Sequence, residues 1–150
     1  MMTGAGSDVL ARAVRTVLSD SEFVEREHLR LPGYKKSQLR QFTGRCYVAS
    51  ESYFHLAGGR ESGLKLRHAK LRYAINGFPA GTSHYWLVGT DDSPIDLTAE
   101  QFECAFPYEL GIGWEFLTCQ PSVRAQKIID RATEPYPSLI VTCPNLLPPL

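Results

Sequence analysis

The chain has 150 residues, of which 16 are basic and 16 are acidic, and its hydrophobic fraction is 43%. These values are typical of one globular domain, and they exclude a disordered, collagen-like or coiled-coil chain. A formal charge of zero gives no basic field, so we expect no nucleic-acid partner. We expect a single domain over residues 1–150, with a helical part over about residues 1–40 and a proline-rich tail over about residues 134–150.

Targeting signals and cysteine spacing suggest a compartment. No apolar stretch approaches the roughly 18 residues that cross a bilayer, so we expect no membrane span. Residues 1–8 hold no basic segment followed by an apolar core, which predicts a cytoplasmic protein without a secretory signal. The cysteines form no close pair, as expected for free thiols in a reducing compartment; they are Cys46, Cys104, Cys119 and Cys143.

The first half of the chain is predicted to be helical. Apolar residues at helical spacing predict an amphipathic helix over about residues 7–18. Polar capping residues then predict a shorter, more charged helix over residues 22–30. A third helix is predicted over residues 46–57, ending at Gly58, and it places Cys46 in its first turn.

Strand patterns occupy the middle of the chain. Residues 65–75 alternate loosely and carry several basic side chains, which either form a solvated strand face or dock an acidic partner. Residues 83–89 form the clearest strand, and a tight polar turn leads into a short strand at residues 95–97. The two strands are predicted to form an antiparallel hairpin, which would bring His84 close to Asp96.

The remaining segments are a turn, a loop, a helix and the tail. Residues 98–102 have the pattern of a capped helical turn, and a helix over residues 122–132 is predicted with Ser122 as its cap. Between them, residues 106–117 form a loop rich in aromatic side chains. These rings either wall a substrate groove or pack in the core, and we favour packing.

Cys46, His84 and Asp96 have the order and setting that a thiol nucleophile requires. The start of a helix carries partial positive charge, which favours a thiolate at Cys46, and Arg45 beside it adds to that charge. An imidazole at His84 can take and return the proton while the Asp96 carboxylate fixes its tautomer. Taken singly, the three also fit a buried thiol, a structural histidine and a capping aspartate.

Three motifs together resemble one superfamily. Residues 44–47 (Gly-Arg-Cys-Tyr), 83–86 (Ser-His-Tyr-Trp) and 94–98 (Pro-Ile-Asp-Leu-Thr) resemble the transglutaminase-like branch of the papain-like cysteine hydrolases. The resemblance covers about residues 41–102, and Leu97 stands where the family usually has proline. It implies an α+β, papain-like core in which a helix bearing the cysteine packs on an antiparallel sheet bearing the histidine and the aspartate.

The resemblance also implies an activity. Members of the superfamily act as proteases, deamidases, peptide N-glycanases or acyl transferases, so we expect a cysteine-dependent hydrolase or transferase acting on an amide bond through a thioester. The expected substrate is a protein or peptide, and no cofactor or metal is required. The chain is also similar to small proteins of phages and their hosts, which would place it in the host cytoplasm if it is phage-encoded. The oligomeric state stays open.

Oxyanion and substrate contacts are assigned with less support from the pattern. Gln41, five residues before Cys46, is placed much as the oxyanion glutamine of papain relatives is placed, and Gln38 competes with it. A solvent-facing glutamine is an equal alternative. Tyr47 and Trp86, which flank the nucleophile and the base, are the other candidates for oxyanion or substrate binding.

Other functions have less support in the sequence. The histidines form no close ligand pair with a cysteine or with one another, which argues against a zinc site; they are His28, His55, His68 and His84. No Gly-x-Ser-x-Gly elbow for a serine nucleophile occurs. Two alternatives stay open: a catalytically inactive domain of the same fold that binds a protein or small ligand in its cleft, and a redox-sensing thiol protein.

Overall fold

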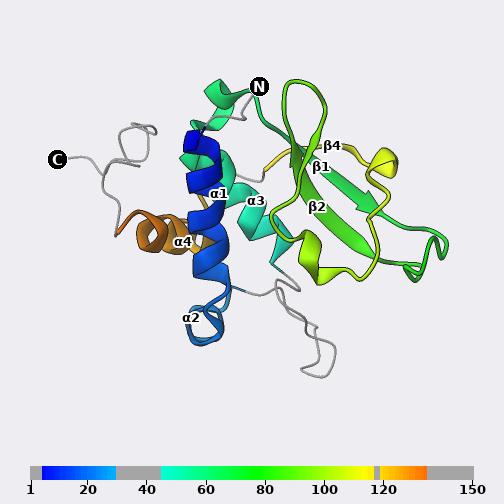
Figure 1. Cartoon of the computed structure of the whole chain (residues 1–150), viewed down its shortest axis with the longest axis horizontal. Coiled ribbons are helices and arrows are strands. Elements are labelled where there is room, and N and C mark those ends of the chain that lie inside the picture. Colours follow the sequence, from blue (N-terminus) through cyan, green and yellow to red (C-terminus); the bar gives the residue numbers. More distant parts are fainter. Residues whose placement is uncertain (1–4, 30–44, 117–118, 135–150) are drawn as a thin grey trace.

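The computed structural model describes residues 5–29, 45–116 and 119–134. In these residues, helices lie beside a four-stranded antiparallel sheet, which makes the architecture α+β (Figure 1). The elements are α1 (Ala5–Leu18), α2 (Ser21–Arg26), α3 (Cys46–Leu56), η2 (Gly59–Ser62), β1 (Lys65–Lys70), β2 (Ser83–Val88), β3 (Pro94–Ile95), η3 (Ala99–Gln101), η4 (Tyr108–Leu110), β4 (Ile112–Trp114) and α4 (Val123–Thr133), where η marks a 3-10 helix.

The first two helices begin close to where the sequence predicts. Helix α1 buries an apolar stripe that includes Leu10 and Val14, and it packs against α3 and α4. Helix α2 begins after Asp20, whose carboxylate accepts a hydrogen bond from the backbone N–H of Phe23 at 3.1 Å. It ends at Arg26 and is therefore shorter than the predicted span of residues 22–30.

Helix α3 lies at the centre of the molecule. It contacts α1, α4 and β2, and most of its side chains are buried. The residue before it, Arg45, is also buried, and its guanidinium donates to the carbonyl oxygen of Leu18 at the end of α1. Arg45 therefore links the end of α1 to the start of α3, and it also lies beside Cys46 in the chain.

The sheet has the strand order β3-β2-β1-β4, with β1 and β2 in the middle. Strand β1 ends at Lys70, earlier than the predicted end at residue 75. Beyond it, a turn at Asn76 and Gly77, both with positive φ, closes a separate bridge between residues 75 and 78. Strand β4 lies in the segment that the sequence predicts as an aromatic loop, and it pairs with β1.

Both faces of the sheet are covered. In the β1–β2 register, His68 pairs with Tyr85 on the face toward the helices, which we call the helical face. Ala69 pairs with His84 on the opposite face, which we call the loop face. A second cluster of buried residues covers the loop face; it consists of Ala69, Leu71, Phe78, Trp86, Val88 and Phe106. His84 therefore lies on a different face from most of the helical core.

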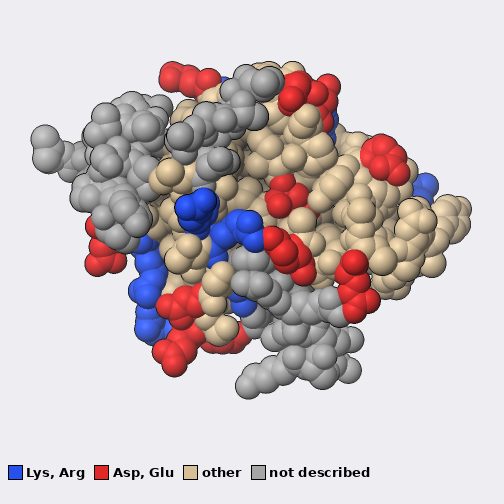
Figure 2. All heavy atoms as spheres, viewed as in Figure 1, with Lys and Arg blue, Asp and Glu red and all other residues tan. Residues whose placement is uncertain are grey.

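Charged side chains of both signs are mixed on the surface. In Figure 2 basic and acidic residues lie close together on the helical side of the molecule, while the surface over the sheet is mostly uncharged. Among the described helices, none is both long and apolar enough to pass through a lipid bilayer. The proline-rich segment from residue 135 onward lies outside the described residues.

Candidate active site

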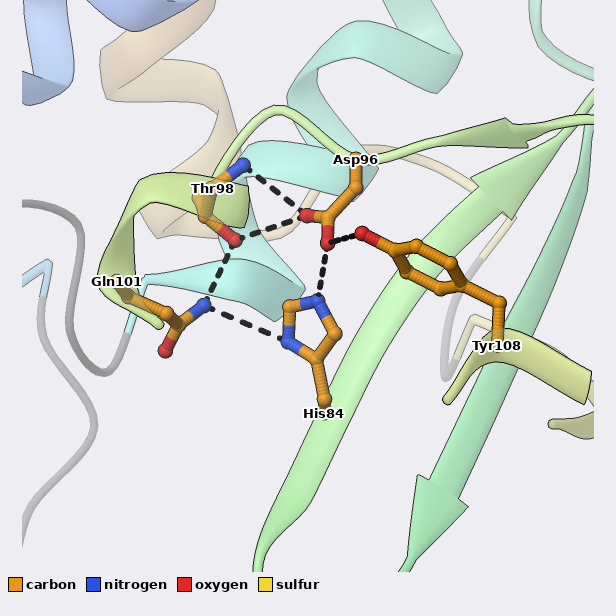
Figure 3. Close-up of polar contacts among 5 residues, drawn as sticks. All are labelled: His84, Asp96, Thr98, Gln101 and Tyr108. Atoms are coloured by element: carbon orange, nitrogen blue, oxygen red, sulfur yellow. Dashed lines mark hydrogen bonds and ion pairs between the residues drawn. The ribbon is translucent and has the colours of Figure 1, made fainter. Parts of the chain in front are cut away.

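The imidazole of His84 and the carboxylate of Asp96 are hydrogen-bonded, as the predicted hairpin requires. Nε2 of His84 lies 2.6 Å from Oδ2 of Asp96 (Figure 3). Leu87 of β2 pairs with Ile95 of β3, and Asp96 is the next residue after Ile95. This register brings Asp96 to the part of β2 that carries His84. The predicted contact between these two residues is present in the structure.

The carboxylate of Asp96 accepts several hydrogen bonds. The phenol of Tyr108 donates to Oδ2 at 2.7 Å, while the backbone N–H and the hydroxyl of Thr98 lie 3.1 Å and 3.3 Å from Oδ1. Burial by itself would raise the pKa of Asp96, but the bonds from His84, Tyr108 and Thr98 lower it below its ordinary value. Asp96 is therefore held as a carboxylate in a fixed orientation.

Aromatic rings enclose the imidazole of His84. Its side chain has 0% of its surface exposed, and the ring centroids of Phe102, Phe106 and Trp86 lie 4.7, 4.9 and 5.7 Å from its own. Burial lowers the pKa of His84, but hydrogen bonds to Asp96 and Cys46 and the charges of both outweigh it and raise the pKa to about 9. The imidazolium form is thus stabilised although the ring is buried.

Cys46 is the first residue of α3 and is 5% exposed. Helix α3 packs against β2, the strand that carries His84. The thiol is close enough that a bond to Cys46 contributes to the raised pKa of His84. The structure therefore brings Cys46, His84 and Asp96 together at the junction of α3, β2 and the end of β3.

Gln101 is a member of the site that the sequence did not single out. Its amide Nε2 lies 3.4 Å from Nδ1 of His84 and donates to the hydroxyl of Thr98 at 2.9 Å. The turn η3 holds it there, although the hydroxyl of Thr98 does not cap that turn as predicted and contacts Asp96 and Gln101 instead. The three-residue spacing of Thr98 and Gln101 is the signal that could have indicated their contact.

Tyr108 is the second member that sequence reasoning missed. The sequence predicts a groove wall or a core contact for it, and its ring packs on Trp86 and Phe106. Its hydroxyl, however, reaches Asp96, and burial together with that bond raises the pKa of Tyr108. The sequence offers no local pattern for this contact, because η4 brings Tyr108 over the loop face of the sheet from a separate turn.

The three candidates for oxyanion or substrate contacts have different positions. Tyr47 follows Cys46 in α3, with its ring centroid 5.0 Å from that of Tyr85. Trp86 is buried and shielded from solvent. Its ring stacks on that of His84, and Gly111 packs directly against it. Gln41, like its competitor Gln38, lies outside the described residues.

A pocket of about 550 Å³ opens on the loop face, on the side of the sheet away from most of the helical core. Trp86 and Tyr108 form part of its wall, and so do Arg67 and Asp92, which form an ion pair with Nη2 and Oδ1 3.6 Å apart. A small molecule in this pocket would therefore touch Tyr108, which holds Asp96.

The remaining histidines and cysteines have other surroundings. His55 is buried in α3 against Phe54 and Phe116, and burial lowers its pKa, so it is neutral at pH 7. Cys104 and Cys119 are exposed free thiols. Within the described ranges, no group of three or more histidine, cysteine or acidic residues is placed to hold a metal ion.

Comparison with known proteins does not identify the chain. No protein-family model matches it, and neither a curated protein nor a solved structure shows significant similarity to it. The function therefore has to be inferred from the chemistry of the site.

Proposed function

We propose that the protein is a cysteine-dependent hydrolase or acyl transferase acting on an amide bond, with Cys46 as nucleophile, His84 as base and acid, and Asp96 as the residue that orients His84. The observation that carries this proposal is the 2.6 Å bond between His84 Nε2 and Asp96 Oδ2, together with the contact of the same imidazole with Cys46. A thiol, an imidazole and a carboxylate in series activate a nucleophile.

We further propose that the fold is a papain-like, transglutaminase-like core. A helix headed by the cysteine precedes an antiparallel sheet, the histidine lies near the start of an inner strand, and the aspartate follows the next strand. This order supports the proposal because it is the order that the resemblance implies. The additional strand β4 extends the sheet beyond β1.

In the first half of the reaction, the Cys46 thiolate attacks the carbonyl carbon of the amide and forms a tetrahedral oxyanion. N–H groups at the start of α3 have no acceptor within the helix and carry partial positive charge, so they suit that oxyanion. The carbon–nitrogen bond then breaks. The imidazolium of His84 gives its proton to the leaving amine, and the acyl group stays on sulfur as a thioester.

In the second half, water or a second amine attacks the thioester. His84, now neutral, takes the proton of the attacking group, and the carbon–sulfur bond breaks to return the Cys46 thiolate and the His84 imidazolium. Water gives hydrolysis or deamidation, and an amine gives transfer. Asp96 accepts from Nε2 throughout, which leaves Nδ1 as the nitrogen that exchanges protons with the thiol and the leaving group.

Burial favours a second candidate function, an inactive domain of this fold that binds a ligand. Cys46 is 5% exposed and His84 is 0% exposed, so a substrate has to displace neighbouring atoms before it can reach the sulfur. In an inactive domain the same three residues would only fill space in the core and satisfy one another's hydrogen-bonding groups. The two candidates differ in whether Cys46 forms a covalent acyl intermediate.

The experiment uses p-nitrophenyl acetate, a small activated ester that requires no substrate recognition. Attack by Cys46 would release p-nitrophenolate and leave an acetyl group on the sulfur, which mass spectrometry of tryptic peptides locates. Cys46→Ala is the test variant. Cys104→Ala, which removes an exposed thiol far along the chain, is the matched control.

The proposal predicts release above the background of free thiol, an acetyl group on Cys46, and loss of both in Cys46→Ala but not in Cys104→Ala. Circular dichroism would establish that both variants fold. If the folded wild-type protein is acetylated at Cys46 no faster than at Cys104, the enzyme proposal fails and the inactive, ligand-binding domain remains as the proposal.

A further inference from the structure

The two nitrogens of the His84 imidazole have different partners. Nε2 is bonded to the carboxylate of Asp96 at 2.6 Å, so Nδ1 is the nitrogen left for the thiol of Cys46. The side-chain amide of Gln101 reaches the same nitrogen, with its Nε2 3.4 Å from Nδ1 (Figure 3). Gln101 therefore lies beside the atom through which the proposed reaction moves its protons.

The amide of Gln101 presents its NH₂ group, and not its carbonyl oxygen, to the imidazole. The hydroxyl of Thr98 donates to Oδ1 of Asp96, so its oxygen serves as the acceptor for Nε2 of Gln101 at 2.9 Å. An amide NH₂ has two hydrogens, and this bond uses one of them. The second N–H is directed at Nδ1 over 3.4 Å, longer than the usual length of about 2.9–3.0 Å, so a better acceptor can take it.

A water molecule can bridge the two nitrogens. Its oxygen can lie about 2.9 Å from both Nε2 of Gln101 and Nδ1 of His84, because two such bonds close a triangle on the 3.4 Å separation. There the water accepts from the amide and donates to the neutral imidazole. Once Cys46 carries an acyl group it has no thiol proton to offer, so Nδ1 can accept from the water.

Gln101 also links the buried imidazole to the surface. Cys46 is 5% exposed and the side chain of His84 is 0% exposed. Gln101 and the next residue, Phe102, are only half-buried, and Gln101 ends η3, a turn of three residues. A small molecule that enters past this turn meets the amide of Gln101 beside Nδ1.

An N–H donor at this place favours water over an amine as the acyl acceptor. The oxygen of water has two lone pairs, so one can accept from Gln101 while the other attacks the thioester. The nitrogen of an amine has a single lone pair. If that pair accepts from the amide, it cannot attack the carbonyl carbon. The donor therefore assists hydrolysis and hinders transfer to an amine.

We propose that Gln101 is a catalytic residue of the second half-reaction: together with Nδ1 of His84 it binds the attacking water, and the acyl group passes to water. This inference rests on the proposed function, because it needs an acyl group on Cys46. The water oxygen bonds to the acyl carbon and one of its protons passes to Nδ1. The carbon–sulfur bond then breaks, its electron pair stays on the Cys46 thiolate, and a carboxylic acid leaves.

The test separates the two half-reactions of p-nitrophenyl acetate. Acylation is followed as release of p-nitrophenolate, a leaving group that departs without a proton from His84. Hydrolysis is followed after excess ester is removed, as loss of the acetyl group from the intact protein by mass spectrometry. Gln101→Met is the test variant, because it keeps the length of the side chain and removes the amide. It should slow hydrolysis about tenfold, as expected for one hydrogen bond, and change acylation less than about twofold.

A purely structural role for Gln101 predicts a different result. If the amide only supported Thr98 and Asp96, Gln101→Met would slow both half-reactions alike. Hydroxylamine cleaves thioesters without a general base, so its rate with the acetylated protein should stay unchanged, and the ratio of hydroxamate to acetate should rise about tenfold. Gln126→Met removes another half-buried glutamine amide, which is bonded to Asp130 far from the site, and as the matched control should change neither rate.

Gln101→Glu has nearly the same shape and serves as the second variant if Gln101→Met does not fold. Its carboxylate accepts from a protonated Nδ1 and cannot donate to water. It should therefore hold the proton on His84, slow hydrolysis near neutral pH and move the rise of the hydrolysis rate to higher pH.

The two proposals fail in different ways in this experiment. The absence of an acetyl group on Cys46 would overturn the proposed function. An acetyl group that forms on Cys46 but is not removed by water would overturn only the assignment of Gln101 and water. Hydrolysis that the Gln101 variants leave unchanged, or slow only as much as they slow acylation, would do the same and leave the proposed function standing.

Discussion

His84 and Tyr108 bond to the same atom, Oδ2 of Asp96, at 2.6 and 2.7 Å. The two donors come from different segments, since His84 lies on β2 and Tyr108 begins η4. Because two donors share one oxygen and Thr98 occupies the other, the carboxylate cannot rotate without breaking several bonds. The direction in which Asp96 holds the imidazole is therefore set by the loop that covers the sheet.

Tyr108→Phe tests whether this phenol is a positioning residue. The variant keeps the ring that packs on Trp86 but removes the donor to Asp96, so acylation by p-nitrophenyl acetate should slow by about tenfold, as expected for a bond to a charged group. Since that bond helps to lower the pKa of Asp96, its loss should move the acid limb of the pH–rate profile to higher pH. A slower variant with an unmoved acid limb would indicate a merely structural role.

The raised pKa of His84 predicts how stability depends on pH. The folded value is about 9 and the ordinary value is 6.5, so the native state binds more protons between these limits. The resulting stabilisation is complete below pH 6.5 and is lost as the pH rises through 9. We expect the free energy of unfolding, measured with urea, to fall across this window.

The His84→Phe variant provides the control for this pH dependence. A phenyl ring suits the aromatic surroundings of position 84, and it cannot titrate. Its unfolding free energy should be lower than that of the wild type near pH 6.5 and should change less between pH 6.5 and 9. Parallel pH profiles for the two proteins would contradict the raised pKa of His84.

Glu51 is a buried carboxylate that caps a helix. Its Oε2 and Oε1 accept from the backbone N–H and hydroxyl of Ser122 at 2.8 and 2.7 Å, which ties α3 to the start of α4. Glu51→Gln leaves one of these donors without an acceptor and should lower the unfolding free energy by about 1–3 kcal/mol. Glu22→Gln, at an exposed position in α2, should change it by less than about 0.5 kcal/mol. Equal effects would contradict the capping role.

Gly111 is needed for a close approach and not for its backbone angles. Its φ of −69° suits any residue, but an added Cβ would collide with the ring of Trp86. Gly111→Ala should therefore cost about 1–3 kcal/mol of unfolding free energy through overpacking. At Gly113 the nearest atom is the end of the flexible Arg67 side chain, so Gly113→Ala should cost much less. A smaller loss of unfolding free energy in Gly111→Ala than in Gly113→Ala would contradict this packing.

Much of the fold could be predicted because local patterns decide it. The apolar spacing of α1, the capping serine of α4 and the polar turn before β3 each determine their element within a few residues. The contact of His84 with Asp96 also follows from local information, since a hairpin of short strands leaves little freedom of register.

The parts that could not be predicted depend on contacts distant in sequence. Strand β4 is only three residues long and gains its pairing from β1, more than forty residues earlier in the chain. The hydrogen bonds of Tyr108 to Asp96 and of Arg45 to Leu18 likewise join separate elements, and no sequence spacing predicts them. The residue types and their order were enough to predict the proposed nucleophile, base and orienting residue. The side chains that hold these three in place depend on tertiary packing, so the sequence did not reveal them.

Labelling of the native protein with iodoacetamide below neutral pH, with each cysteine quantified by mass spectrometry, distinguishes an activated thiol at Cys46 from a buried structural one. We expect Cys46, although buried, to react faster than Cys104, Cys119 and Cys143, because it lies beside His84 at the start of α3. The excess should disappear in His84→Phe. A Cys46 that reacts no faster than the other three would contradict an activated thiolate at this site.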